Sequence, residues 1–110
     1  MKTIYKYPIQ IVDRQTLLIP EGAIVRYLGL DPNGALCLWA EVDKEVESVE
    51  ISIAVVGTGR PVPPKGRHLG SAVQGPFVWH VYDVTTTVGI KDLLSPFRVT
   101  KPESPTPSQP

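Results

Sequence analysis

Apolar and polar residues alternate along several short stretches of this chain, and the clearest of them spans residues 49–56. The even positions of this stretch include Glu50 and Ser52. The odd positions are all branched and apolar: Val49, Ile51, Ile53 and Val55. A period of two is the pattern of a β-strand with one buried side. The stretch therefore predicts a strand that turns one face toward a hydrophobic core.

Similar short runs recur along the chain and are separated by turn residues. The strongest turn signal is Asp31-Pro32-Asn33-Gly34, because proline pre-sets the first central position and Asn-Gly tolerates a left-handed backbone. Pro8 lacks an amide donor, so the first strand is expected to lie at a sheet edge or to bulge there. The strands are predicted at residues 3–12, 16–19, 23–30, 35–42, 49–56, 69–74 and 77–84. The fold is therefore expected to be all-β, a small antiparallel β-sandwich or flattened barrel of about six to seven strands.

The C-terminal part of the chain differs in composition from the rest. Residues 90–94 are expected to form at most one helical turn before Pro96, and residues 101–110 contain no apolar side chain except proline. A segment that buries nothing cannot offset its ordering entropy, so a disordered Pro-rich tail is predicted. We expect a β domain at residues 1–84, an extension at 85–100 that could pack on a neighbouring subunit, and the tail at 101–110.

The predicted strand at residues 35–42 has bulky side chains on both faces, which is typical of a central strand. Cys37, the only cysteine, is then expected to be a small buried residue rather than a nucleophile. A single cysteine excludes an intrachain disulfide and is compatible with a reducing cytoplasm. No apolar run is long enough to span a bilayer, and the N-terminus lacks the apolar core of a signal peptide.

The formal net charge is zero, which argues against binding to polymeric nucleic acid or to an anionic membrane. The charges are nevertheless separated along the sequence. An acidic region at residues 41–50 contrasts with a basic region that contains Arg60, Lys65 and Arg67 next to His68. One interpretation is two solvated loops of opposite sign, and the other is a basic binding loop.

The segment from Gly57 to His68 is the main candidate site. Gly57-Thr58-Gly59 lacks the lysine and the following helix of a phosphate-binding loop, and Arg60-Pro61 follows instead. Two glycines can still form a concave anion-binding nest, and the basic side chains suit phosphate. The alternative is a strand-ending turn that needs positive φ. The predicted ligand-binding residues are Thr58, Gly59, Arg60, Lys65, Arg67, His68 and Trp79.

Aromatic residues at strand spacing are expected to belong to the core. These residues are Trp39, Phe77, Trp79 and Tyr82. A base-stacking role would require one of them on an open face beside the basic loop. Trp79 is the nearest candidate for that role.

Catalytic and metal chemistry have weak sequence support. His68 and His80 are the only histidines, and a zinc site needs three or four ligands. Ser71 could face His80 across the last predicted hairpin, but no nucleophile elbow or oxyanion motif accompanies the pair. We therefore expect neither an enzyme nor a cofactor.

Several runs of residues follow one another in an order and spacing that point to a known family. The runs are residues 2–7, 11–16, 36–40, 56–59 with Pro61, 69–70 and 78–82. Through these runs, which cover about residues 1–83, the chain resembles a family of small proteins encoded by tailed bacteriophages and prophages, which share a domain of unknown function. Arg60 stands where the family pattern has histidine. The resemblance implies a phage setting, and with it the host cytoplasm, but no established activity.

Two functional hypotheses follow. In the first, a homo-oligomeric β-sandwich sequesters a small anionic, nucleotide-type signal through the loop at residues 57–68 and so blunts a host defence without catalysis. In the second, the protein is an adaptor or inhibitor of another protein and acts through a strand edge or its charged loops. A third, less favoured hypothesis is that the protein is a structural accessory of the virion.

Overall fold

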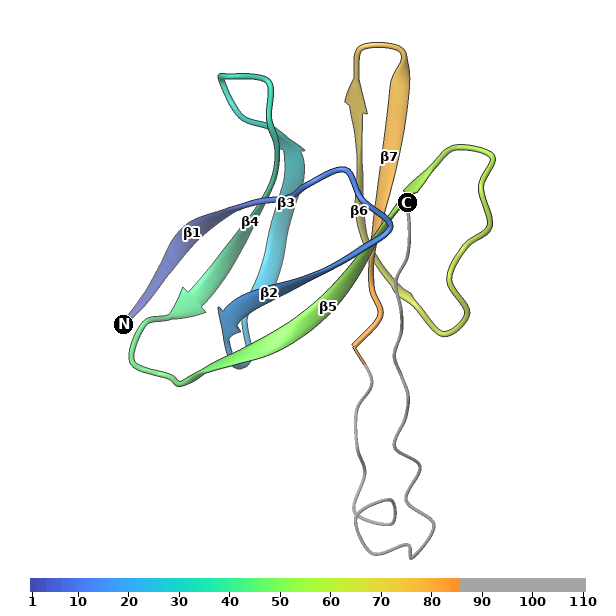
Figure 1. Ribbon diagram of the computed structural model, residues 1–110. Helices are drawn as coiled ribbons and strands as arrows, with labels where there is room; N and C mark the ends of the chain where they lie inside the picture. The colour runs from blue at the N-terminus through green and yellow to red at the C-terminus, as the bar shows by residue number, and fades with distance from the viewer. Residues whose placement is uncertain (86–110) are drawn as a thin grey trace, which may run out of the picture.

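The computed structural model describes residues 1–85, which form seven antiparallel strands in two sheets (Figure 1). The strands are β1 (Lys2–Pro8), β2 (Arg14–Pro20), β3 (Ile24–Leu30), β4 (Leu36–Asp43), β5 (Ser48–Gly57), β6 (Arg67–Gln74) and β7 (Phe77–Asp83). One sheet has the order β1-β4-β3 and the other β2-β5-β7-β6. Residues 1–85 contain no helix, and so none that could cross a bilayer. The predicted all-β architecture is confirmed, whereas the predictions for residues 86–110 lie outside the described residues.

The core lies between the inner faces of the two sheets. Leu38 and Val42 on β4 face Ile53 on β5 and Val81 on β7, and each is at most 1% exposed. Complete burial of such a side chain stabilises the fold by roughly 1.5–3 kcal/mol. The alternation predicted for β5 is confirmed at its buried centre, because Ile53 and Val55 belong to this core.

The two sheets approach each other closely where β3 meets β6. A side chain at Gly70 would place its Cβ 2.9 Å from Cβ of Leu28, so only glycine fits without displacement. The register of β6 against β7 shifts between His68 and Gly70, as at a β-bulge, which bends the bulged strand locally. β3 and β6 are edge strands of their sheets, so this contact joins the two sheets along one edge of each.

The first strand is shorter than the alternation predicted. β1 lies at a sheet edge as expected, but it ends at Pro8, and residues 9–13 form a loop instead of continuing the strand. Proline cannot donate to the ladder, so pairing stops there. Ile9 remains buried, and its amide donates a hydrogen bond to the Leu36 carbonyl at 2.9 Å, whereas Ile11 is exposed. Residues 11–13 of this loop line a groove beside the loop between β5 and β6.

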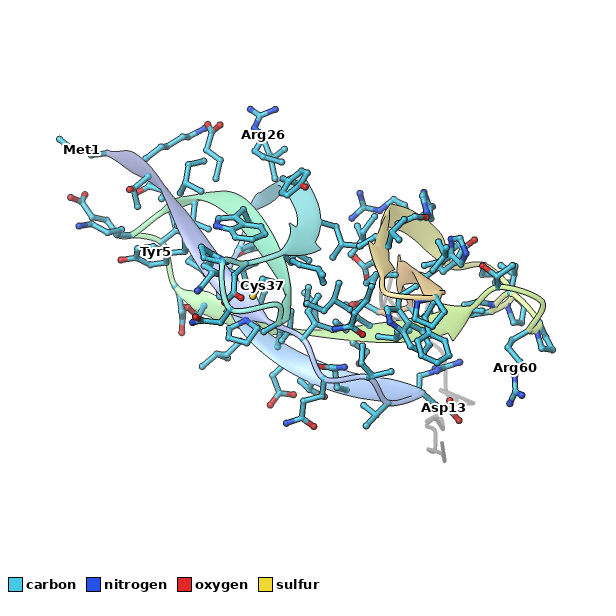
Figure 2. All side chains as sticks on the ribbon, turned by 90° about the horizontal axis from the view of Figure 1, so that it is seen from above. Met1, Tyr5, Asp13, Arg26, Cys37 and Arg60 are labelled. Carbon is cyan, nitrogen blue, oxygen red and sulfur yellow. The ribbon has the colours of Figure 1, made fainter. Side chains whose placement is uncertain are left out.

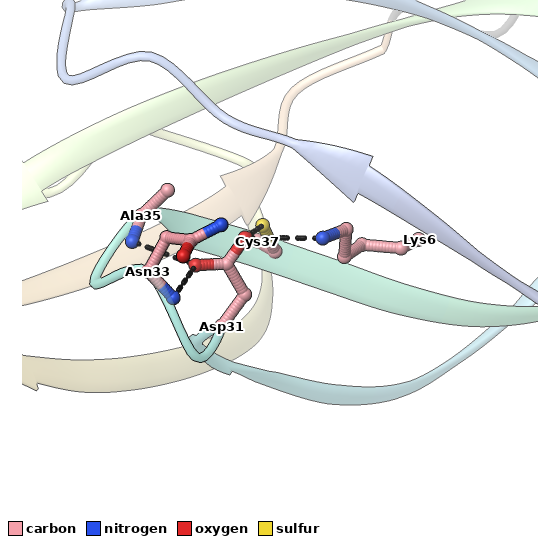
Figure 3. Close-up of polar contacts among 5 residues, drawn as sticks. All are labelled: Lys6, Asp31, Asn33, Ala35 and Cys37. Carbon is pink, nitrogen blue, oxygen red and sulfur yellow. Dashed lines mark hydrogen bonds and ion pairs between the residues drawn. The ribbon is translucent and has the colours of Figure 1, made fainter.

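The turn between β3 and β4 is organised by the Asp31 carboxylate (Figure 3). Its Oδ1 accepts the amides of Asn33 and Ala35 at 2.9 and 3.0 Å, and Lys6 Nζ lies 3.0 Å from Oδ2. The Asp31 side chain is only 7% exposed. The Ala35 amide and the Lys6 ammonium hold the pKa of Asp31 below its usual value.

Cys37 lies beneath this turn on the central strand β4, and it is buried as predicted. Its Sγ–H points to Oδ2 of Asp31 at 3.8 Å. Burial, followed by the negative charge of Asp31, raises the pKa of the thiol. Since the thiolate is the reactive form, this position does not favour nucleophilic chemistry.

The aromatic residues do not share one environment, and the expectation of a common core location is wrong for most of them. Trp79 packs against the core from the inner face of β7. Phe77 is 55% exposed. Trp39 and Tyr82 are half-buried on outer faces, where Trp39 contacts Tyr27 at a centroid distance of 5.4 Å. Strand alternation placed these rings at the correct period but did not show which outer face would remain uncovered.

Candidate functional site

The loop between β5 and β6 begins with a tight turn. The Arg60 amide donates to the Gly57 carbonyl at 3.0 Å, and Gly59 has a φ of +93°. A positive φ at the third position is the requirement of a type II turn. The Thr58 amide donates to the Val78 carbonyl at 3.3 Å. The amides of Thr58 and Arg60 are therefore used within the fold, and an anion nest cannot draw on them.

A second turn stiffens the other end of this loop. The Gly66 amide donates to the Pro63 carbonyl at 3.2 Å, and Pro64 supplies the fixed φ of the first central position. Lys65 occupies the next position with a φ of +63°, the one left-handed non-glycine residue among residues 1–85. A side chain with a Cβ is disfavoured in this region. The loop is thus held in a defined conformation at some cost in strain.

A groove of about 700 Å³ lies between this loop and the connection from β1 to β2. It exists because β2 begins at Arg14, opposite Ala54, while β5 continues three residues further without that neighbour. Residues 54–57 form its floor, residues 11–14 one wall and residues 60–64 the other. In Figure 2, Asp13 and Arg60 lie at the same end of the molecule, opposite Met1.

Two arginines flank this groove. Arg14 comes from one wall and Arg60 from the other, and neither forms an ion pair with any residue in the described part of the chain. Asp13 contributes the one carboxylate of the lining. The remaining walls are largely valine, isoleucine and proline. The groove therefore combines apolar walls with cationic groups on both sides.

Trp79 lies at the base of the groove, where the sequence predicted a stacking residue. Its ring packs over Gly57, at which a Cβ would lie 3.3 Å from Cζ3 of the indole. Its Nε1 donates to Oε1 of Gln74 at 2.9 Å, and Phe77 stacks on it at a centroid distance of 5.4 Å. A smaller hollow of about 290 Å³ continues from Trp79 toward Phe77. The indole is therefore fixed in orientation and borders both hollows.

On the opposite face of β7, a chain of four hydrogen-bonded side chains runs from the loop across the last hairpin. Thr58 Oγ1 lies 2.9 Å from Nε2 of His80. Nδ1 of His80 lies 2.7 Å from Oγ of Ser71, which lies 3.0 Å from Nε2 of His68. The prediction that Ser71 faces His80 is confirmed by the strand register. We call these four residues the outer-face chain.

The predicted site residues therefore separate into different places. Arg60 and Trp79 line the groove, whereas Thr58 and His68 belong to the outer-face chain. Arg67 pairs with Asp83 at 3.1 Å.

The remaining two predicted residues hold turn positions. Gly59 provides the left-handed residue of the first turn, and Lys65 that of the second. No group of three or more histidine, cysteine, aspartate or glutamate side chains that could hold a metal ion occurs within residues 1–85.

The sequence interpretation missed the wall formed by residues 11–14, and with it Arg14. Residues 11 and 12 belong to the first predicted strand, and residues 13 and 14 fall between that strand and the next one. Nothing in their local pattern indicates that they lie beside a loop more than forty residues away. The available signal was Pro8, which ends β1 and so leaves the next residues free to form a loop.

Residues 1–89 match the family model described as "Domain of unknown function (DUF7352)", and the chain belongs to this family. The match includes every strand of the two sheets. No curated protein and no solved structure matches the chain. The predicted membership in a family of unknown function is thereby confirmed.

Proposed function

We propose that this protein binds a small anionic ligand without catalysis, and that the ligand occupies the groove between residues 11–14 and 60–64. The observation that carries the proposal is the pair of arginines on opposite walls, Arg14 and Arg60, neither of which has an ion-pair partner within residues 1–85. Guanidinium groups bind phosphate and carboxylate through paired, charge-assisted hydrogen bonds.

The dimensions and lining of the groove support a ligand of nucleotide type. Its volume of about 700 Å³ lies within the range of small-molecule sites, which are mostly apolar with a few polar groups. Prolines and the Trp79 indole offer apolar surface for a flat base, while the arginines suit a phosphate. The two tight turns of the β5–β6 loop reduce the entropy lost on binding.

The biological setting follows from the resemblance to phage proteins. In that setting, the protein is encoded by a phage or prophage, acts in the host cytoplasm and sequesters a nucleotide-type signal that would otherwise activate a defence. Sequestration needs affinity and abundance but no catalytic group. The groove supports the binding step, and the resemblance alone supports the phage setting.

Calorimetry against a panel of cyclic and linear nucleotides tests the proposal. We expect at least one nucleotide to bind to the parent protein. Arg14→Gln and Arg60→Gln should each weaken binding roughly 10- to 100-fold, the effect of losing one charge-assisted contact. Added salt should weaken the parent as well.

Lys44→Gln is the matched control, because it removes the same charge from an exposed residue beyond the other end of β5. It should bind like the parent. If no nucleotide binds, or if all three variants behave alike, the groove is not an anion site and the proposal fails.

A second candidate function is protein–protein adaptor, and a patch on the outer face of the β1-β4-β3 sheet favours it. Ile4 and Ile24 both lie opposite Glu41, and Tyr27 lies opposite Trp39, so the strand register puts all three on one face. Their exposures are 50%, 44% and 61%. Clustered exposed apolar side chains are typical of interaction surfaces.

The first partner to test for this patch is a second copy of the chain, since oligomerisation would stabilise so small a domain. Sedimentation velocity over a range of protein concentrations should give a dimer for the parent and a monomer for Tyr27→Ser. A monomeric parent would remove the self-association reading.

A further inference from the structure

The outer-face chain brings a serine hydroxyl into contact with two imidazoles on the solvent side of the last hairpin. Ser71 lies directly opposite His80 in the register of β6 and β7, and Oγ to Nδ1 is 2.7 Å. Nε2 of His68 approaches the same oxygen at 3.0 Å. Ser71 is exposed, and it borders neither of the two hollows described above.

The contacts at the far end of the chain determine which way its protons point. Thr58 Oγ1 lies 3.4 Å from the Val78 carbonyl, which can only accept. If the Thr58 hydroxyl donates there, Nε2 of His80 must carry a proton and donate to Thr58. Nδ1 of His80 is then an acceptor, and it receives the Ser71 hydroxyl proton. If the Thr58 hydroxyl instead donated to His80, no proton would lie between Thr58 Oγ1 and the Val78 carbonyl oxygen.

His68 completes the arrangement. With the Ser71 proton directed to His80, the short contact between His68 and Ser71 requires Nε2–H of His68 as the donor. The ring is held by an edge contact with Tyr82 at a centroid distance of 5.2 Å. A donor beside the nucleophilic oxygen is also placed to donate to charge that develops on an attacked carbonyl.

We propose that Ser71 is a nucleophile for activated esters, with His80 as its general base, Thr58 as the residue that fixes the His80 tautomer, and His68 as the oxyanion donor. Two of the contacts that such a group requires are present, nucleophile to base at 2.7 Å and base to orienting residue at 2.9 Å. The Nε2 donor of His68 lies 3.0 Å from the nucleophile, beside the position that an attacked carbonyl would take. Because the orienting group is a hydroxyl and not a carboxylate, the site is expected to be a weak catalyst.

The step is an acyl transfer. Ser71 Oγ forms a bond to the ester carbonyl carbon while its proton moves to Nδ1 of His80, and His68 donates to the carbonyl oxygen. The bond to the alcohol leaving group then breaks, and the leaving group takes the proton from His80. Water then attacks the carbonyl carbon of the Ser71 ester while His80 takes one of its protons. His80 returns this proton to Ser71 Oγ as the bond between Oγ and the acyl carbon breaks, which releases the acid. Since Ser71 is exposed and lines neither of the two hollows described above, the substrate class is small esters with good leaving groups.

A fluorophosphonate probe tests nucleophilicity directly, because it forms a stable bond to an activated serine. We expect one label per molecule in the mass spectrum of the intact protein, and mass spectrometry after digestion should locate it at Ser71. The rate of nitrophenolate release from 4-nitrophenyl acetate should depend on the same residues as the labelling. His80→Gln should slow both reactions roughly 100-fold, the typical contribution of a general base.

Three further variants separate this role from a structural one. Ser71→Ala should abolish labelling, and Thr58→Val should slow it and shift its pH profile, because His80 is then free to adopt the other tautomer. Ser48→Ala is the control: it removes an exposed serine that lies on β5 and outside the outer-face chain, and it should react like the parent. Circular dichroism of each variant establishes that the fold is retained.

The proposal is overturned if the parent is not labelled, if the label resides on a histidine, or if His80→Gln reacts at the parent rate while folded. None of these outcomes depends on nucleotide binding in the groove. The two proposals can therefore fail separately.

Discussion

Two connections in this protein use similar turn residues but differ in what their polar groups contact. The β3–β4 turn contains Pro32 and a glycine with a φ of +84°, and the β5–β6 loop contains several prolines and a glycine with a φ of +93°. In the first, the Asp31 carboxylate binds two turn amides and a lysine. In the second, Arg60 and Lys65 are exposed and form no ion pair within the described residues.

The difference is that the charged side chain of the first connection is paired within the fold, whereas the charged side chains of the second are exposed to solvent. A carboxylate at the first position of a turn can accept the amides that follow it, as Asp31 does. The β5–β6 loop has no acidic residue; backbone hydrogen bonds close its two turns, and the Thr58 hydroxyl contacts His80. A turn of the first kind contributes to stability, whereas the second is expected to contribute to binding.

The largest effect on stability is expected from Asp31→Ala. The substitution removes a nearly buried acceptor and leaves the amides of Asn33 and Ala35 without their partner. The midpoint of thermal unfolding should fall by roughly 5–10 °C. Arg60→Ala should change it by less than about 3 °C, as for other surface substitutions. Equal midpoints for the two variants, measured by circular dichroism, would remove the distinction between the two connections.

Acid should weaken the first connection selectively. The pKa of Asp31 is lowered in the folded state, so its contribution to stability is complete above the unfolded pKa and is lost as pH falls through the folded pKa. The stability difference between the parent and Asp31→Asn should therefore be constant near neutral pH and should shrink as the pH falls below the unfolded pKa of about 3.9 and through the lower folded pKa. Parallel unfolding midpoints of the two proteins throughout this acid range would contradict this role.

The two left-handed glycines separate stability from binding at a smaller scale. Gly34→Ala and Gly59→Ala each force a Cβ into the left-handed region, and no atom lies within 4 Å of either added Cβ. Each should therefore cost about 1–2 kcal/mol in unfolding free energy, measurable by urea denaturation. Only Gly59→Ala should also weaken nucleotide binding, because it alone repositions Arg60. Weakened binding in both variants would indicate a global rather than a local effect.

The architecture could be predicted from the sequence because its determinants are local. The alternation in β5 and the turn signal at residues 31–34 depend on neighbouring residues only, and both are confirmed. The burial of Cys37 followed from bulk on both sides of a central strand. By contrast, Phe77 shares the inner face of β7 with Trp79 and Val81 but is exposed at the first residue of the strand, and where the core ends along a strand is a property of the assembled sandwich.

The candidate site could be predicted only in part, for the same physical reason. Arg60 was recognised because it follows a Gly-Thr-Gly turn. Arg14 was not, because its proximity to Arg60 results from the pairing of β2 with β5. Arg67 was assigned to the loop, although strand pairing places it opposite Asp83, with which it forms an ion pair. Contacts between distant segments require the register, and charge patterns along the chain do not give it.

The smallest effect on stability is expected from Lys65→Gly. This substitution tests directly whether the β5–β6 loop holds a strained residue. Lys65 has a φ of +63°, a conformation that costs a residue with a Cβ about 1–2 kcal/mol. Glycine removes that strain but adds backbone entropy to the unfolded chain, at about 0.5–1 kcal/mol. The net result should be a gain of at most about 1.5 kcal/mol in unfolding free energy, measured by urea denaturation. Strain of this kind persists where the surrounding structure or a function maintains it.

Nucleotide affinity distinguishes those two causes. If Lys65 contributes its charge to the ligand, Lys65→Gly should bind more weakly even though it is more stable, and Lys65→Arg should restore binding without the gain in stability. If the residue only completes the turn, Lys65→Gly should bind like the parent. A loss of stability in Lys65→Gly would mean that the side chain makes a contact worth more than the strain, and the loop would then resemble the Asp31 turn after all.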